Sequence, residues 1–116
     1  MASLPSQLPQ LAQIVWHDTP VSAMHVDIVG QCFSLVLTPY EEKRDNYGRV
    51  EVSFSQISNL EMQLSALAAK RAGDDLEVYS LEVTAANESY SAHLVLLTDH
   101  GPSSAIAFDF QGVTVS

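Results

Sequence analysis

Apolar and polar side chains alternate along most of this chain, most regularly in residues 21–37. Every second position there is a large apolar residue: Met24, Val26, Ile28, Phe33, Leu35 and Leu37. Successive side chains of a β-strand point to opposite faces, so this spacing predicts two strands, each with one apolar face. Gly30-Gln31 lies between them, and glycine tolerates the positive φ of a two-residue type I′ or II′ turn. The stretch therefore predicts a β-hairpin, which needs further strands or a helix to be stable.

The same two-residue period recurs downstream and predicts six more strands. They cover residues 50–54, 59–64, 76–84, 90–97, 106–110 and 113–115. Val78 interrupts the alternation in its strand, so both faces of that strand are expected to be partly covered. Charged and turn-forming residues fill 39–48, which predicts an exposed loop, and 85–88 predicts a four-residue hairpin loop.

Helical spacing replaces the alternation in two places. Leu8, Leu11 and Ile14 recur every three residues, and a proline next to Leu8 suits the first turn of a short helix. Residues 65–72 are rich in helix formers, begin with a serine that can cap a helix, and precede Gly73, which can end one. This second stretch predicts a helix of about two turns.

These elements have short connections and no internal repeat or linker, so residues 1–116 are expected to form a single domain. The fold class is α+β and mainly β: an antiparallel meander sheet, curled or folded into a sandwich, with one or two short helices. No apolar run approaches the roughly 20 residues of a membrane span, and no signal peptide is evident. The single Cys32 excludes an internal disulfide framework, so we expect a cytoplasmic protein without membrane contact.

The net charge is −9, and acidic residues gather toward the C-terminus. Residues 72–116 contain seven acidic residues and no Lys or Arg, which argues against nucleic-acid binding and favours a basic protein partner. Solubility alone is the alternative reason for such acidity. Tyrosines in the 39–48 loop add contact area at low entropic cost. We expect a non-catalytic protein-binding domain, with these candidate partner-binding residues: Tyr40, Tyr47, Asp74, Asp75 and Glu77.

Histidines next to aspartates raise a second class of function. His17-Asp18 precedes the hairpin, and His25 and Asp27 share one face of its first strand, so the two segments together offer nitrogen and oxygen ligands for zinc. That face is also where solvent-exposed polar residues belong, so we expect neither a cofactor nor catalysis. A small metal-binding or hydrolytic enzyme that uses these four residues is the alternative. A structural module that oligomerises through free sheet edges is a further alternative.

Four landmarks together resemble the small immunity proteins of bacterial polymorphic toxin systems. They are Trp16-His17-Asp18, the hairpin over 21–37, the strand over 50–54, and the strand ending in phenylalanine with a short terminal strand over 108–115. The resemblance covers most of the chain. It implies a β-rich protein that binds a cognate toxin and blocks it, and the acidity of the chain would suit a basic nuclease toxin.

Overall fold

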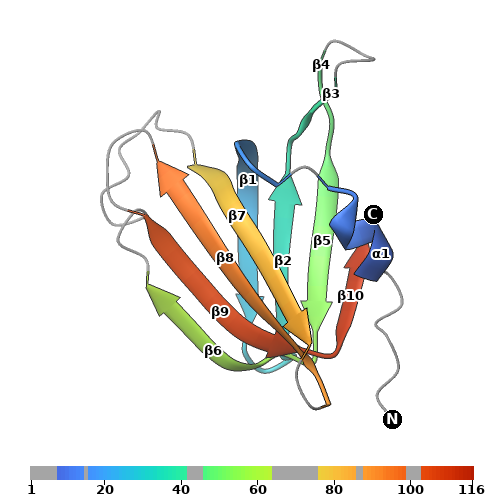
Figure 1. The fold of residues 1–116 in the computed structure, drawn as a ribbon, viewed down its shortest axis with the longest axis vertical. Helices are drawn as coiled ribbons and strands as arrows, with labels where there is room; N and C mark the ends of the chain where they lie inside the picture. Colours follow the sequence, from blue (N-terminus) through green and yellow to red (C-terminus); the bar gives the residue numbers. More distant parts are fainter. Residues whose placement is uncertain (1–7, 15, 42–45, 64–75, 86–87, 99–102) are drawn as a thin grey trace.

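Eight antiparallel strands form one sheet that curls, so that its two halves face each other across a common core (Figure 1). The computed structural model describes residues 8–14, 16–41, 46–63, 76–85, 88–98 and 103–116. The elements are α1 (Leu8–Ala12), β1 (Thr19–Asp27), β2 (Cys32–Leu37), β3 (Tyr40–Glu41), β4 (Asn46–Tyr47), β5 (Val50–Ser55), β6 (Ser58–Gln63), β7 (Leu76–Ala85), β8 (Tyr90–Thr98), β9 (Ser104–Phe110) and β10 (Gly112–Val115). The sheet order is β10-β5-β2-β1-β7-β8-β9-β6, and β3 and β4 form a separate ribbon. The expected mainly β architecture with a curled antiparallel sheet is therefore confirmed.

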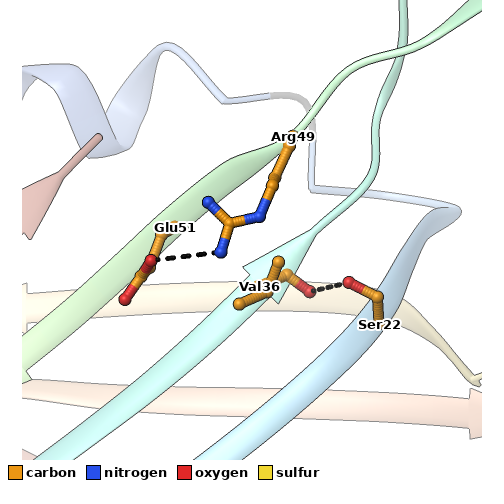
Figure 2. Close-up of polar contacts among 4 residues, drawn as sticks. All are labelled: Ser22, Val36, Arg49 and Glu51. Atoms are coloured by element: carbon orange, nitrogen blue, oxygen red, sulfur yellow. Dashed lines mark hydrogen bonds and ion pairs between the residues drawn. The ribbon is translucent and has the colours of Figure 1, made fainter.

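β1 joins the two halves of the sheet. Its first residues, Thr19 and Pro20, pair with β7, whereas the rest of the strand pairs with β2. A bulge near Ser22 interrupts the second pairing, and the Ser22 hydroxyl donates a hydrogen bond of 3.3 Å to the Val36 carbonyl (Figure 2). Bulges bend a strand and increase its twist, so this one helps β1 change partners.

A second bend connects the β10–β5 end of the sheet to the β9–β6 end. β5 continues into β6 and β9 continues into β10, and the two bent segments pair with each other on both sides of the corner. Ser58 pairs with Asp109 just past the bend, and the Gln111 N–H donates to the Ser55 carbonyl within it. A Cβ atom on Gly112 would meet Ser55 Oγ, so a larger residue at this position would require the Ser55 hydroxyl to rotate away.

The inward-facing residues predicted from the alternation form the core. Buried side chains from both halves include Phe33, Leu35, Leu37, Val52, Phe54, Leu94, Leu96, Ile106, Phe108 and Phe110. The ring centroid of Phe54 lies 5.0 Å from that of Phe108 and 4.9 Å from that of Phe110, both in edge-to-face geometry. Phe54 therefore connects the β5 side of the core to the β9 side. α1 lies beside β10 at one margin of the sheet (Figure 1).

The β1–β2 hairpin is confirmed, but its predicted two-residue turn is wrong. β1 ends at Asp27, and a four-residue turn over 28–31 follows. Asp27 Oδ1 accepts a 2.9 Å hydrogen bond from the Gly30 N–H, and Gln31 has a φ of 55°. Ile28 was expected on the core face of the strand, yet it is 79% exposed and Val29 is 97% exposed. The hydrogen bond between the Gly30 N–H and the Asp27 side chain ends β1 at Asp27, although the apolar alternation continues to Ile28.

β7 explains the interrupted alternation around Val78. The ladder with β8 shifts between Val78 and Ser80, so Tyr79 occupies a bulge. Val78 faces the core before the bulge, and Leu81 packs against the core after it. One extra residue in a strand reverses the phase of the alternation, which accounts for the pattern in the sequence.

Two other predictions concern the connections. The helix expected around Leu8 is confirmed as α1, whereas the helix expected over 65–72 lies outside the described residues. The loop expected over 39–48 contains the β3–β4 ribbon, in which Tyr40 pairs with Tyr47. Short paired segments can form within a loop when its two ends are already held by neighbouring strands, here β2 and β5.

Replacing Gln31 with glycine is expected to stabilise the protein by about 0.5 kcal/mol, because glycine adopts a positive φ without a clash involving Cβ. Urea denaturation would measure the free energy of unfolding of both proteins. Gln111→Gly is the matched control, because Gln111 is also exposed in a connection but has no positive φ. A loss of stability in Gln31→Gly as large as that in the control would contradict the interpretation of this turn.

Candidate functional site

The outer face of the β7-β8-β9-β6 half carries a row of chemically distinctive side chains across four strands. Glu82 on β7 pairs with His93 on β8, His93 pairs with Ala107 on β9, and Ala107 pairs with Glu61 on β6. Asp109 lies two residues along β9 from Ala107, on the same outer face. We call the surface formed by Asn59, Glu61, Glu82, His93 and Asp109 around Ala107 the acidic face.

The acidic face follows from the same alternation that builds the core. On β8 and β9, the neighbours Leu94 and Ile106 are buried, so His93 and Ala107 point away from the core. Ala107 has a short side chain between longer ones on adjacent strands. The surface is hollowed at this point, with a volume of about 350 Å³ lined in part by the residues of the acidic face. A side chain from another molecule therefore has room above Ala107.

Asp109 is held in its ionised form by two neighbouring side chains. The Ser91 hydroxyl donates a hydrogen bond of 2.6 Å to Asp109 Oδ1, and the Asn59 amide donates one of 2.8 Å to Asp109 Oδ2. Both hydrogen bonds favour the charged carboxylate and therefore lower the pKa of Asp109 from its ordinary value. The bond from Ser91 has the larger effect. Asn59 reaches across because it has a φ of 54° and lies where the β6–β9 register shifts.

Positive charge in the described residues lies elsewhere. Arg49 is the single Lys or Arg in the described part of the chain, and its guanidinium lies 3.4 Å from the carboxylate of Glu51 (Figure 2). Glu51 is on β5, which belongs to the other half of the sheet. No described Lys or Arg therefore neutralises Glu61, Glu82 or Asp109.

The residues predicted for partner binding are placed in different parts of the chain. Tyr40 and Tyr47 lie opposite each other in the β3–β4 ribbon, which projects from one end of the sheet (Figure 1). Glu77 is half-buried where β7 pairs with β1 and β8. Asp74 and Asp75 lie outside the described residues. The structure thus brings the two tyrosine positions together and places Glu77 at a junction between strands.

The four residues of the alternative metal or hydrolytic site fall into two separate pairs. His17 Nδ1 lies 2.9 Å from the Tyr79 carbonyl, and its Nε2 lies 3.3 Å from the Asp18 carboxylate, so this pair ties the start of β1 to β7. His25 and Asp27 lie near the far end of β1. His25 lies six positions after Thr19, which is about 20 Å along a strand. Within the described ranges, no group of three or more His, Cys, Asp or Glu residues could hold a metal ion.

The alternation in residues 106–110 places Asp109 on an outer face, but it does not reveal the acidic face. The hydrogen bond between Asn59 and Asp109 joins residues 50 positions apart, and it depends on β6 pairing with β9. The hairpin loop predicted over 85–88 would place Glu82 opposite Ser91, whereas the structure pairs Ala85 with Tyr90 and Glu82 with His93.

No protein-family model matches the chain, and a search of curated proteins found no significant match. In the part of the chain that the structure describes, no helix has the length and apolarity needed to cross a membrane.

Replacing Ser91 with alanine is expected to raise the pKa of Asp109 toward its ordinary value and to destabilise the fold by about 1 kcal/mol near pH 6. Because solvent reaches this carboxylate, we expect a smaller loss of stability than the loss of a buried hydrogen bond to a charged group would cause. The lowered pKa stabilises the folded protein above about pH 4, the ordinary pKa of aspartate, and this stabilisation is lost as the pH falls through the folded value. The difference in free energy of unfolding between Ser91→Ala and the native protein should therefore become smaller below pH 4.

Carboxyl NMR titration would measure the pKa, and urea denaturation at pH 6 and pH 3 would measure stability. Ser53→Ala is the control, because Ser53 lies on β5, in the other half of the sheet. An Asp109 pKa that does not move in Ser91→Ala would show that this hydrogen bond does not determine it.

Proposed function

We propose that this chain is a non-catalytic protein-binding domain that holds a basic partner on the acidic face. The observation that carries the proposal is the row Glu82, His93, Ala107 and Glu61, with Asp109 beside it and no described Lys or Arg to neutralise it. Glu61 lies directly beside Ala107 on β6, Asp109 lies two residues along β9, and Glu82 lies one strand beyond His93. Such a surface is complementary to a lysine or arginine side chain presented by another protein.

The spacing of the strands fits this role. Adjacent strands lie about 4.8 Å apart, and residues two apart on one strand are separated by about 7 Å. A cationic group above Ala107 would therefore lie within reach of Glu61 on β6 and of Asp109 on β9. Hydrogen bonds between charged groups are shorter and stronger than those between neutral ones. Asp109 is already ionised and oriented by Ser91 and Asn59, so binding requires little reorganisation of this carboxylate.

The net charge supports the same proposal at longer range. A charge of −9 attracts a basic partner before contact and raises the rate of encounter, most strongly at low salt. Tyr40, Tyr47, Asp74, Asp75 and Glu77 remain proposed as additional contact residues. If the resemblance to immunity proteins holds, the partner is a basic toxin and the role of the domain is inhibition.

Capture from a lysate of the source organism tests the proposal. The immobilised chain is washed with increasing salt, and eluted proteins are identified by mass spectrometry and then purified for measurement of binding. We expect a basic protein that binds directly, with an affinity that falls steeply as salt increases. Purified binding that is insensitive to salt would contradict the proposal. Recovery of the chain itself as the sole ligand would instead support an oligomerising module.

A further inference from the structure

A groove between α1 and the β7–β8 hairpin is lined mainly by apolar side chains. It has a volume of about 410 Å³ and lies on the opposite side of β7 and β8 from the acidic face. Its walls include Leu8 and Leu11 from α1, and Val83 and Tyr90 from the two strands. Volumes of about 300–1,000 Å³ are typical of small-molecule sites.

The walls of the groove are held by contacts within the protein. The Trp16 indole N–H donates a hydrogen bond of 3.1 Å to the Leu11 carbonyl, which fixes the tryptophan ring against the end of α1. Leu11 is only 3% exposed and belongs to the core. The Tyr90 ring stacks on Phe110 at a centroid distance of 5.8 Å. Two aromatic walls are therefore positioned by the protein itself, without a ligand.

The lining specifies the chemistry of an occupant. None of the described lining residues is charged, and the Trp16 N–H is already hydrogen-bonded, so Tyr90 brings the remaining side-chain polar group. A charged ligand would lose its hydration without gaining a partner of opposite charge. We propose that the groove binds a neutral, mainly apolar small molecule with an aromatic ring and one acceptor for the Tyr90 hydroxyl.

The size of the groove favours a small molecule over a protein segment. A specific protein interface buries at least about 1,000 Å² in total, whereas this hollow suits a compound of two or three rings.

The proposal is independent of partner binding on the acidic face, because the two sites use opposite sides of β7 and β8. Each can fail without the other.

Trp16 is the only tryptophan in the chain, and it lines the groove, so its fluorescence reports occupancy directly. The probe is N-phenyl-1-naphthylamine, a neutral aromatic compound that accepts excitation energy from tryptophan. We expect saturable quenching of Trp16 with a dissociation constant below about 1 mM. The anionic comparison is 1-anilinonaphthalene-8-sulfonate, which has the same ring system plus a sulfonate. It should bind at least tenfold more weakly, because the lining has no cation.

Val83→Phe fills the groove from β7 and should weaken binding of the neutral probe by at least about tenfold. Val95→Phe is the matched control, because Val95 lies on β8 facing away from the core and outside the groove, so binding should stay unchanged. Ala85→Phe, at an exposed lining position, provides a second blocking variant if Val83→Phe does not fold. The inference is overturned if quenching by the neutral probe does not saturate, or if that probe binds Val83→Phe as tightly as Val95→Phe. It is also overturned if the sulfonate binds the native protein more tightly than the neutral probe does.

Discussion

Replacing Phe54 with alanine is expected to lower the free energy of unfolding by about 4 kcal/mol. Small domains have only about 5–15 kcal/mol in total, so this single change should leave much of the chain unfolded. Phe54 is 1% exposed, and its ring packs edge-to-face against Phe108 and Phe110 from the opposite half of the sheet. Alanine removes the contacts that join the two halves and leaves a cavity between them.

Phe54→Leu is the matched control for this prediction. Leucine keeps most of the buried volume but loses the aromatic contacts, so we expect a loss of about 1 kcal/mol. Urea denaturation should be followed by circular dichroism and by fluorescence of Trp16, which packs against the core from the side of α1. The two transitions should coincide if one core connects the halves. A loss below about 1 kcal/mol in Phe54→Ala would contradict that description of the core.

Reversing two charges on the acidic face is expected to weaken binding of the captured basic partner by about 100-fold at low salt. The variant is Glu61→Lys combined with Glu82→Lys, which places a cation on each side of Ala107. A lysine or arginine of the partner would then meet like charges, and the attraction before contact would also weaken. Both positions are exposed, so the fold should be retained.

The control is Glu51→Lys combined with Glu88→Lys, which changes the net charge by the same amount away from the acidic face. Glu51 lies on β5 in the other half of the sheet, and Glu88 lies between β7 and β8. Isothermal titration calorimetry with the purified partner should show only a small loss, about threefold, from reduced long-range attraction. Equal losses in the two double variants would mean that net charge, and not the acidic face, determines binding.

Much of the fold could be predicted from local patterns, because burial of one strand face imposes a period of two on the residues. Phe54 and Phe108 lie on the apolar faces that this period gives the strands predicted over 50–54 and 106–110, and both are buried. Ile28 was placed wrongly because it continues the apolar period while the Asp27 carboxylate already closes the turn. A local hydrogen bond therefore overrode the pattern.

The candidate site was harder to predict because it depends on which strands are neighbours. β5 and β6 are consecutive in the chain, yet the bend at 56–57 sends β6 to the far end of the sheet order. That crossing brings Glu61 beside Ala107 and Asn59 beside Asp109. Alternation identifies the face of each residue but not its cross-strand partner, so these neighbours had no local signal.

The groove beneath α1 has the same origin. Its lining combines Leu11 and Trp16 from the start of the chain with Val83 and Tyr90 from the β7–β8 hairpin. The sequence indicates that each is apolar, and tertiary packing alone determines that a space remains between them.

The most direct test of the central claim is an NMR titration of the isotopically labelled protein with a ten-residue lysine peptide. Backbone amide shifts report which surface a cationic chain contacts. We predict the largest changes at Glu61, His93, Ala107 and Asp109, with loss of these changes in the Glu61→Lys and Glu82→Lys double variant. Largest changes around Glu51 and Glu88, or changes spread evenly over all exposed acidic residues, would contradict the assignment of partner binding to the acidic face.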